Sequence, residues 1–346
     1  MITYDKRFHL NETRTKMSRS FRPPYTDIDK LISIINNGDT VLLEDHLAGF
    51  DCNHSNQILT ILNEKVYKRT EIKYGQILED SIKNKYSNLN IGFEFTTQNV
   101  FLWQPLGTYT QHPKVHYKNF ICSFNGSAHV SRQLLVSILE KFKYYDPGYC
   151  SKNFSYSTDT IDGHIINYMP DQDTLYRKFF VSADSEYFFQ SINSFGNIRY
   201  AHDDSVRHIQ YAHDTNIYNL ENKLTESFLH IVSETMATSY VPFVTEKFLY
   251  SIVTRGLFLS YAQPGWHAHI EKYYGFKLYT KLFDYRFDSI QNPIERLVEL
   301  ITMISKFSKL SYADLYDIYL MELDTINYNY DHYFSGDYIK KLKEYE

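Results

Sequence analysis

Short apolar segments alternate along the chain with segments in which hydrophobic residues recur every three or four positions. The short segments predict β-strands, and the recurring pattern predicts amphipathic helices. The expected strands are Thr40–Glu44, Leu89–Thr97, Asn119–Phe124, Phe228–Val232 and Leu257–Tyr261. The expected helices are Tyr25–Asn36, Asn56–Val66, Arg132–Lys143 and Pro293–Phe307. Helices that alternate with short strands are typical of an α/β protein with a parallel sheet and crossover connections.

Two of these helices have a well-defined apolar face, and we expect that face to be buried. In the earlier helix it consists of Leu134, Leu135, Ile138, Leu139 and Phe142. In the later one it consists of Ile294, Leu297, Val298, Ile301 and Ile304, with Pro293 at the first helical position.

A chain of 346 residues has room for two domains. The stretch Gln104–Lys118 is polar, contains proline and shows no periodicity, so it is the expected linker. We therefore expect one domain at 1–115, with a basic N-terminal arm, and a second at 116–346.

The segment Phe228–Gly256 carries the strongest functional pattern. Its expected strand ends at Glu234, a polar loop follows, and the triplet Thr245-Glu246-Lys247 begins an amphipathic helix that Gly256 ends. In an open α/β sheet, ligands bind at the carboxyl ends of strands and at helix N-termini. Two carboxylates and a lysine there suit the hydroxyls and phosphates of a nucleotide-sugar. The simpler alternative is that these residues only cap the helix.

These motifs resemble the α1,3-fucosyltransferases, glycosyltransferase family 10. That family carries a strand ending in F-E-N-S, then Y-x-T-E-K at a helix start, then G-x-x-P-[IV] before a strand. Here Val232-Ser233-Glu234-Thr235, Phe243–Lys247 and Gly256–Leu259 stand in that order. An upstream strand at Asn119–Gly126, with Arg132 opening the next helix, is similar to a second family element. Thr235, Phe243 and the missing proline depart from the pattern and leave the transferred sugar open.

The resemblance implies two Rossmann-like domains that face each other across a cleft, the GT-B arrangement. The donor, a GDP- or UDP-sugar, is expected mainly on the C-terminal domain. Arg132 would bind its diphosphate, helped by the turn at Asn125 and Gly126, and without the resemblance it would be a solvent-exposed helix residue. In the Thr245-Glu246-Lys247 motif, Lys247 would add a second positive charge and Glu246 would bind the ribose. Glu234 would lie near the sugar and stabilise oxocarbenium charge.

The reaction that the family implies is an inverting single displacement, with a carboxylate of the N-terminal domain as general base. By position, the candidates are Glu44 and Asp45 at the end of the expected strand Thr40–Glu44, with Glu94 in reserve. Since Arg and Lys can neutralise the leaving diphosphate, no metal is expected.

Composition indicates the cellular compartment and the partners to expect. A net charge of −5 does not favour nucleic-acid binding, and three unpaired-looking cysteines suggest a reducing compartment. Neither a signal peptide nor a long apolar run is present, so we expect no membrane and a cytoplasmic location, the host cytoplasm for a viral protein. Abundant Tyr and Phe, 32 and 24 residues, reflect AT-rich coding.

Two polar clusters could bind a metal, but neither has a convincing pattern. The residues His202, Asp203, Asp204, His208 and His213 match no zinc spacing. The triplet Asp171-Gln172-Asp173 is a D-x-D in a segment that looks like a turn. Nucleotide-binding and hydrolase motifs with G-x-x-x-x-G-K-[ST], G-x-G-x-x-G or G-x-S-x-G spacing are absent from the sequence.

Two other functions stay open. One is a phage-type glycosyltransferase that modifies hydroxylated bases of duplex DNA, with basic residues at Arg14–Arg22 or Lys65–Lys73 as the contact. The other is a non-catalytic binding protein on a transferase fold. The acceptor is accordingly a glycan or modified DNA.

Overall fold

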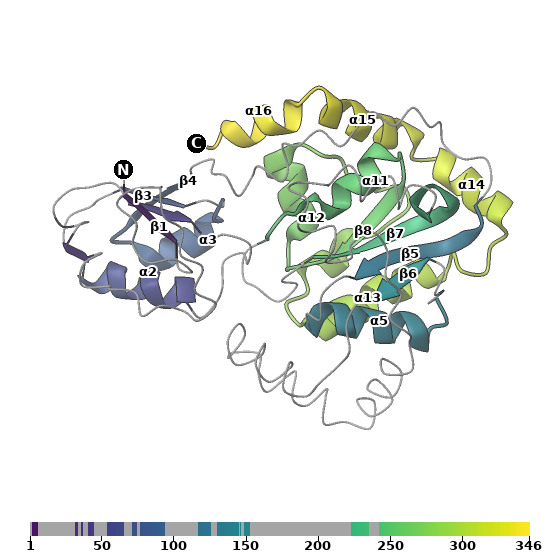
Figure 1. The fold of residues 1–346 in the computed structure, drawn as a ribbon, viewed down its shortest axis with the longest axis horizontal. Coiled ribbons are helices and arrows are strands. Elements are labelled where there is room, and N and C mark those ends of the chain that lie inside the picture. The colour runs from purple at the N-terminus through teal and green to yellow at the C-terminus, as the bar shows by residue number, and fades with distance from the viewer. Residues whose placement is uncertain are drawn as a thin grey trace, which may run out of the picture.

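The structure is a computed structural model. It describes residues 2–5, 32–33, 36, 41–44, 54–65, 71–74, 77–93, 117–125, 130–144, 146, 149–152, 223–234 and 242–346. These residues form an α/β protein with two parallel four-stranded sheets (Figure 1).

The first sheet consists of β1 (Ile2–Asp5), β2 (Val41–Glu44), β3 (Glu71–Tyr74) and β4 (Asn90–Phe93), in that spatial order. All neighbouring strands are parallel, so each must be reached by a crossover. The helices α2 (His54–Lys65) and α3 (Asp80–Lys83) and the 3-10 turn Asn84–Tyr86 belong to this part of the chain. Sequence analysis predicted β2, β4 and α2 but neither β1 nor β3, because four residues such as ITYD or EIKY are too short and too polar to show a clear period.

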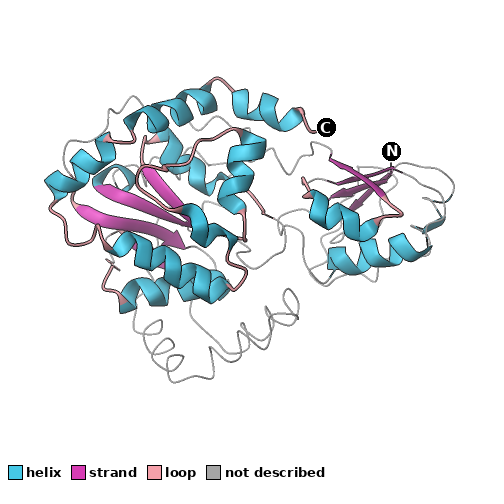
Figure 2. Ribbon diagram, turned by 180° about the vertical axis from the view of Figure 1, so that it is seen from behind, coloured by secondary structure: helices cyan, strands magenta, loops and turns pink. Residues whose placement is uncertain are grey.

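The second sheet consists of β5 (Asn119–Asn125), β6 (Cys150–Lys152), β7 (Ser227–Ser233) and β8 (Leu257–Tyr261), in the order β6-β5-β7-β8. All its pairings are parallel. Every residue of β7 and β8 is buried, as expected for strands covered on both faces. Helices lie on both sides of this sheet, with α5 (Val130–Lys141) and α13 (Pro293–Ser305) together on one of them (Figures 1 and 2).

The predictions for this sheet were confirmed for β5, β7 and β8 within two residues at each end, and the predicted helices correspond to α5 and α13. Asn292 caps α13, since its Oδ1 accepts hydrogen bonds from Ile294 N at 2.9 Å and Glu295 N at 3.2 Å. Two predicted core positions were wrong: Phe142 is 37% exposed and Val298 is 39% exposed. Phe142 lies just beyond the last residue of α5, and Val298 lies at the edge of the apolar stripe of α13.

After β7 the chain forms a 3-10 turn at Glu246–Phe248 and the short helix α11 (Leu249–Val253). After β8 it forms α12 (Trp266–His269), which runs directly into a π-helical turn, Ile270–Tyr274, and later the 3-10 turn Tyr285–Ser289. Three helices complete the chain: α14 (Tyr312–Leu320), α15 (Leu323–Phe334) and α16 (Asp337–Lys343).

Sequence analysis missed α14 to α16, and α15 shows why. Its buried positions are Ile326, Asn329, His332 and Tyr333, a helical stripe in which two members are polar. Asn329 binds the backbone of Lys277 through both its amide atoms, at 2.8 and 2.9 Å. His332 Nε2 donates to the Tyr274 carbonyl at 2.8 Å. The stripe therefore serves as a support for the loop after the π-turn, and a hydrophobicity pattern cannot reveal it.

The two sheets are connected by packing and by charge. Ile77 and Phe93, from the first part of the chain, belong to the same hydrophobic cluster as the core of the second sheet. Glu79 lies 3.2 Å from Lys272 Nζ and 3.8 Å from His269 Nδ1. The arrowheads of β5 and β7 point to the side of the molecule on which the first sheet lies (Figures 1 and 2).

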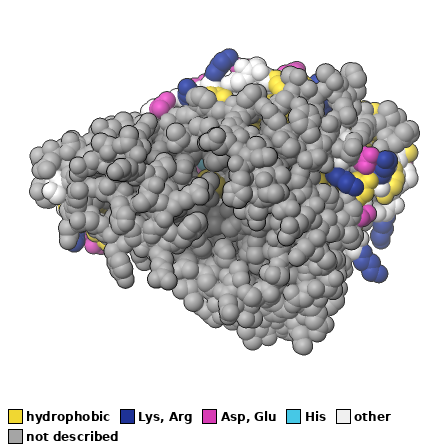
Figure 3. Space-filling model, viewed as in Figure 1, with side chains coloured by type: hydrophobic (Ala, Val, Ile, Leu, Met, Phe, Trp, Pro, Cys, Tyr) yellow, Lys and Arg dark blue, Asp and Glu magenta, His cyan; other side chains and the backbone are white. Residues whose placement is uncertain are grey.

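Surface features of the described residues are mixed. Charged side chains of both signs lie along the upper and right-hand margins of one face (Figure 3). Within the described ranges, no helix has both the length and the apolar character needed to cross a bilayer.

Candidate functional site at the carboxyl edge of the second sheet

The carboxyl ends of β5 and β7 lie next to each other in the middle of the second sheet. From β5 the chain moves to one side, to β6, and then returns across β5 to β7 and β8. In open α/β sheets, such a reversal of direction between neighbouring strands marks the place where ligands bind. Asn125 is the last residue of β5 and Glu234 directly follows β7, so two predicted site residues lie at this point.

Glu234, Thr245 and Lys247 form one hydrogen-bonded network. The Thr245 hydroxyl donates to Glu234 Oε2 at 2.6 Å, and the Thr245 backbone N–H donates to Oε1 at 3.3 Å. Lys247 Nζ donates to the Thr245 hydroxyl oxygen at 2.8 Å and lies 3.7 Å from Glu234 Oε2. The structure thus brings together three residues that the sequence placed in one site.

The network is buried at one end and open at the other. The Glu234 side chain is 0% exposed, whereas the Lys247 side chain is 22% exposed. A carboxylate removed from water must be compensated by donors or by a cation, and Thr245 and Lys247 supply both. Lys247 is therefore the charged group of this network that is partly open to solvent.

Tyr274, the last residue of the π-turn, was not expected from the sequence. It is buried, and burial together with the Glu234 carboxylate raises the pKa of its hydroxyl above the ordinary range. Since a π-turn does not follow the spacing of three or four residues, the sequence pattern could not place Tyr274 near Glu234.

Asn125 and Arg132 lie at the same edge of the sheet, on β5 and at the beginning of α5. Asn125 Nδ2 donates to the Ser123 hydroxyl at 3.2 Å, and Ser123 donates to the Ile231 carbonyl of β7 at 2.9 Å. These two hydrogen bonds connect the Asn125 side chain, through Ser123, to β7. Arg132 is only 4% exposed, so it is not the solvated helix residue of the alternative interpretation.

Several predicted residues cannot be placed. Gly126, Asp45 and Glu94 lie outside the described residues, as do the D-x-D at 171–173 and the histidines at 202–213. For Glu44 and Glu246 only the backbone is described: Glu44 ends β2 opposite Asp5 of β1, and Glu246 begins the 3-10 turn. Among the described residues, no group of three or more His, Cys, Asp or Glu side chains could hold a metal ion.

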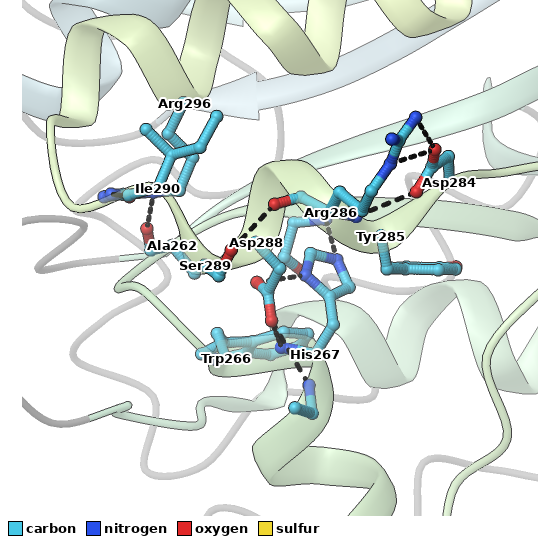
Figure 4. A network of polar contacts seen from close by, with 12 residues as sticks. Ala262, Trp266, His267, Asp284, Tyr285, Arg286, Asp288, Ser289, Ile290 and Arg296 are labelled. Atoms are coloured by element: carbon cyan, nitrogen blue, oxygen red, sulfur yellow. Dashed lines mark hydrogen bonds and ion pairs between the residues drawn. The ribbon is translucent and has the colours of Figure 1, made fainter.

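A second polar cluster is formed by α12 and the turn Tyr285–Ser289, which follow β8 in the chain (Figure 4). Its histidine and aspartate resemble a catalytic pair. His267 Nδ1 lies 2.7 Å from Asp288 Oδ1, and both side chains are buried. However, His267 Nε2 accepts a hydrogen bond from the Ser260 backbone N–H at 3.0 Å, so Nδ1 carries the hydrogen that is donated to Asp288. With Nε2 occupied in this way the imidazole has no nitrogen left for proton transfer. The pair is a structural clamp between β8, α12 and the turn Tyr285–Ser289.

Comparison of the chain with family models, with curated proteins and with solved structures finds no match.

Proposed function

We propose that this protein is an inverting glycosyltransferase of the GT-B type, which moves a sugar from a GDP- or UDP-sugar to an acceptor hydroxyl. The observation that carries this proposal is the Glu234–Thr245–Lys247 network beside the switch point between β5 and β7. A partly exposed ammonium at a strand end suits the diphosphate of a nucleotide-sugar. Two parallel sheets in one chain are compatible with the two domains that such an enzyme requires.

In this proposal Lys247 and Arg132 neutralise the diphosphate as it leaves, and the Thr245-Glu246-Lys247 segment and the Asn125-Gly126 turn surround the nucleotide. A carboxylate of the first sheet, Glu44 or Asp45, removes the acceptor proton while the hydroxyl oxygen attacks the anomeric carbon. In this proposal, neither the neutralisation of the diphosphate nor the removal of the acceptor proton uses a metal ion. The buried thiols of Cys122 and Cys150 suit a reducing cytoplasm.

For the acceptor we favour a glycan hydroxyl over a base in DNA. The net charge of −5 argues against DNA, because duplex DNA is usually bound by a concentrated basic surface. Transfer assays with oligosaccharides and with hydroxymethylated duplex DNA distinguish the two acceptors.

Binding of nucleotide-sugars to wild type and Lys247→Ala tests the proposal. Calorimetry with GDP- and UDP-sugars should show binding by wild type, and loss of one charge-assisted contact should weaken it by about 1.5–3 kcal/mol. Lys118→Ala is the matched control: Lys118 also pairs with a glutamate, Glu226 at 2.7 Å, but it precedes β5 and so lies at the opposite edge of the same strands. Equal affinity in wild type and Lys247→Ala would contradict the proposed site.

A further inference from the structure

The position of the Glu234 carboxylate points to a role that differs from the one expected from the sequence. Both of its oxygens accept hydrogen bonds from Thr245, one from the backbone N–H and one from the hydroxyl. The backbone N–H of Glu234 donates to the Tyr261 carbonyl at 3.1 Å, so the residue is still bonded to β8. The side chain also has no exposed surface.

The Thr245 hydroxyl connects Glu234 to Lys247. Its single proton is donated to Glu234 Oε2, which leaves its oxygen lone pairs for Lys247 Nζ at 2.8 Å and the Lys247 backbone N–H at 3.4 Å. The order of donors is therefore fixed: lysine to threonine, and threonine to carboxylate. Because the carboxylate also attracts Nζ over 3.7 Å, it limits where the ammonium can go.

We propose that Glu234 is a positioning residue, which holds the Lys247 ammonium in place through Thr245 and does not touch the transferred sugar. This inference rests on the proposed function for the identity of the ligand, a nucleoside diphosphate group. The lysine is preorganised at one end by a buried anion and offers its exposed side to the phosphates. A ligand phosphate then shares the ammonium with Glu234 and does not have to order a flexible side chain.

A contact with the sugar and a positioning role predict different effects on ligands with and without the sugar. If Glu234 positions Lys247, Glu234→Gln lowers the affinity for GDP or UDP alone and for the corresponding nucleotide-sugar by the same factor, about tenfold. Lys247→Ala gives a larger loss, because it removes the contact itself, and the double variant loses no more than Lys247→Ala alone, since both changes act on the same interaction. Unchanged affinity of Glu234→Gln for the nucleoside diphosphate, with a lower affinity or turnover only for the nucleotide-sugar, overturns the inference.

Thr245 variants test the connection itself. Thr245→Val keeps the volume but removes the hydroxyl, and it should reproduce the loss seen in Glu234→Gln. Thr245→Ser keeps the hydroxyl and should recover most of that affinity. Equal affinities for Thr245→Val and Thr245→Ser overturn the connection, and near-UV circular dichroism on each variant shows whether the fold is intact.

A labelling experiment without any ligand separates this inference from the proposed function. Lys247 is acetylated with an amine-reactive ester and quantified by mass spectrometry, with Lys118 as the internal reference. Release of Lys247 in Glu234→Gln and Thr245→Val should increase its labelling several-fold, while Lys118 keeps its rate. Equal Lys247 rates in wild type and both variants overturn the inference. Wild type that binds none of the nucleotides, but shows the increased labelling in the variants, overturns the proposed function alone.

Discussion

Gly275 is the residue at which the backbone most clearly demands a glycine. It follows the π-turn with φ +78°, a left-handed conformation that L side chains rarely adopt. A Cβ built there would lie 2.9 Å from His332 Nε2, the atom that binds the Tyr274 carbonyl. A side chain at this position would therefore disturb both the backbone and the support that α15 gives to the π-turn.

We predict that Gly275→Ala lowers the free energy of unfolding by about 2–4 kcal/mol, the sum of the left-handed conformation and an overpacked contact. Gly265→Ala is the control, because Gly265 has nearly the same φ of +77° but nothing within 4 Å of its added Cβ. It should show only the conformational part, about 1–2 kcal/mol. Urea unfolding measures both, and equal losses would mean that the His332 contact contributes nothing.

At the site, the sequence predicted which residues lie together but not how they are hydrogen-bonded. The cluster of Glu234, Thr245 and Lys247 could be expected, because residues after a strand and at the next helix start share one edge of a parallel sheet. The direction of the hydrogen bonds among them could not, since it depends on side-chain geometry that spacing does not contain. Tyr274 was missed because it ends a π-turn, which does not follow the spacing of three or four residues.

At the scale of elements, the helix α13 depends on a buried arginine. Arg296 is 1% exposed, and its guanidinium donates to the carbonyls of Ala262, Ile290 and Gln291, with Nε–O 3.1 Å for Ala262 (Figure 4). It thereby joins the segment after β8 to the turn that precedes α13. Sequence analysis identified α13 from its apolar face but gave Arg296 no part, because a charged residue between apolar positions looks like part of the solvated face.

We predict that Arg296→Ala lowers the free energy of unfolding by about 3–5 kcal/mol, because it removes a fully buried side chain and leaves the buried Ala262 carbonyl and two partly buried carbonyls without their donor. Arg286→Ala is the matched control from the same region: its side chain is 91% exposed and pairs with Asp284 at the surface. That variant should unfold at the same denaturant concentration as wild type. Similar losses in the two variants would refute the structural role of Arg296.

Elements with a clear period were predicted well, and those held by polar contacts were not. The strands β5, β7 and β8 are short and apolar because their sheet is covered on both faces. In contrast, α15 buries Asn329 and His332, whose partners are backbone atoms of a distant loop. A periodic pattern of hydrophobic residues predicts which apolar side chains are buried, but it does not predict such polar contacts.

At the scale of the whole molecule, Glu79 makes charged contacts between the two described parts. The neighbouring His269 ring and Lys272 ammonium lower the pKa of the Glu79 carboxyl to about 2, although partial burial opposes this shift. At 3.8 Å the contact with His269 Nδ1 is electrostatic and too long for a hydrogen bond. Burial in turn lowers the pKa of His269, which favours its neutral form.

Because both pKa values are lowered in the folded state, the free energy of unfolding decreases as the pH falls. The pKa of Glu79 is depressed in the folded state, so its contribution is complete above the ordinary value of 4.5 and is lost as the pH falls toward about 2. The depressed pKa of His269 removes stability as the pH falls below its ordinary value of 6.5. We predict that Glu79→Gln is less stable than wild type at neutral pH and that the difference shrinks by about pH 3. Chemical denaturation at both pH values measures it, and a constant difference would exclude the charge of Glu79 as the cause.

The π-turn Ile270–Tyr274 has one more consequence, which concerns the length of the chain. It places Lys272 beside Glu79 of the first part and Tyr274 near Glu234 within the same five residues. Removing one residue would rotate everything after it by about 100°, the angle per residue of an α-helix, and so separate these two contacts. A deletion or insertion in this stretch would therefore disrupt contacts that depend on both of its ends. For this part of the protein, the number of residues carries information that their identity does not.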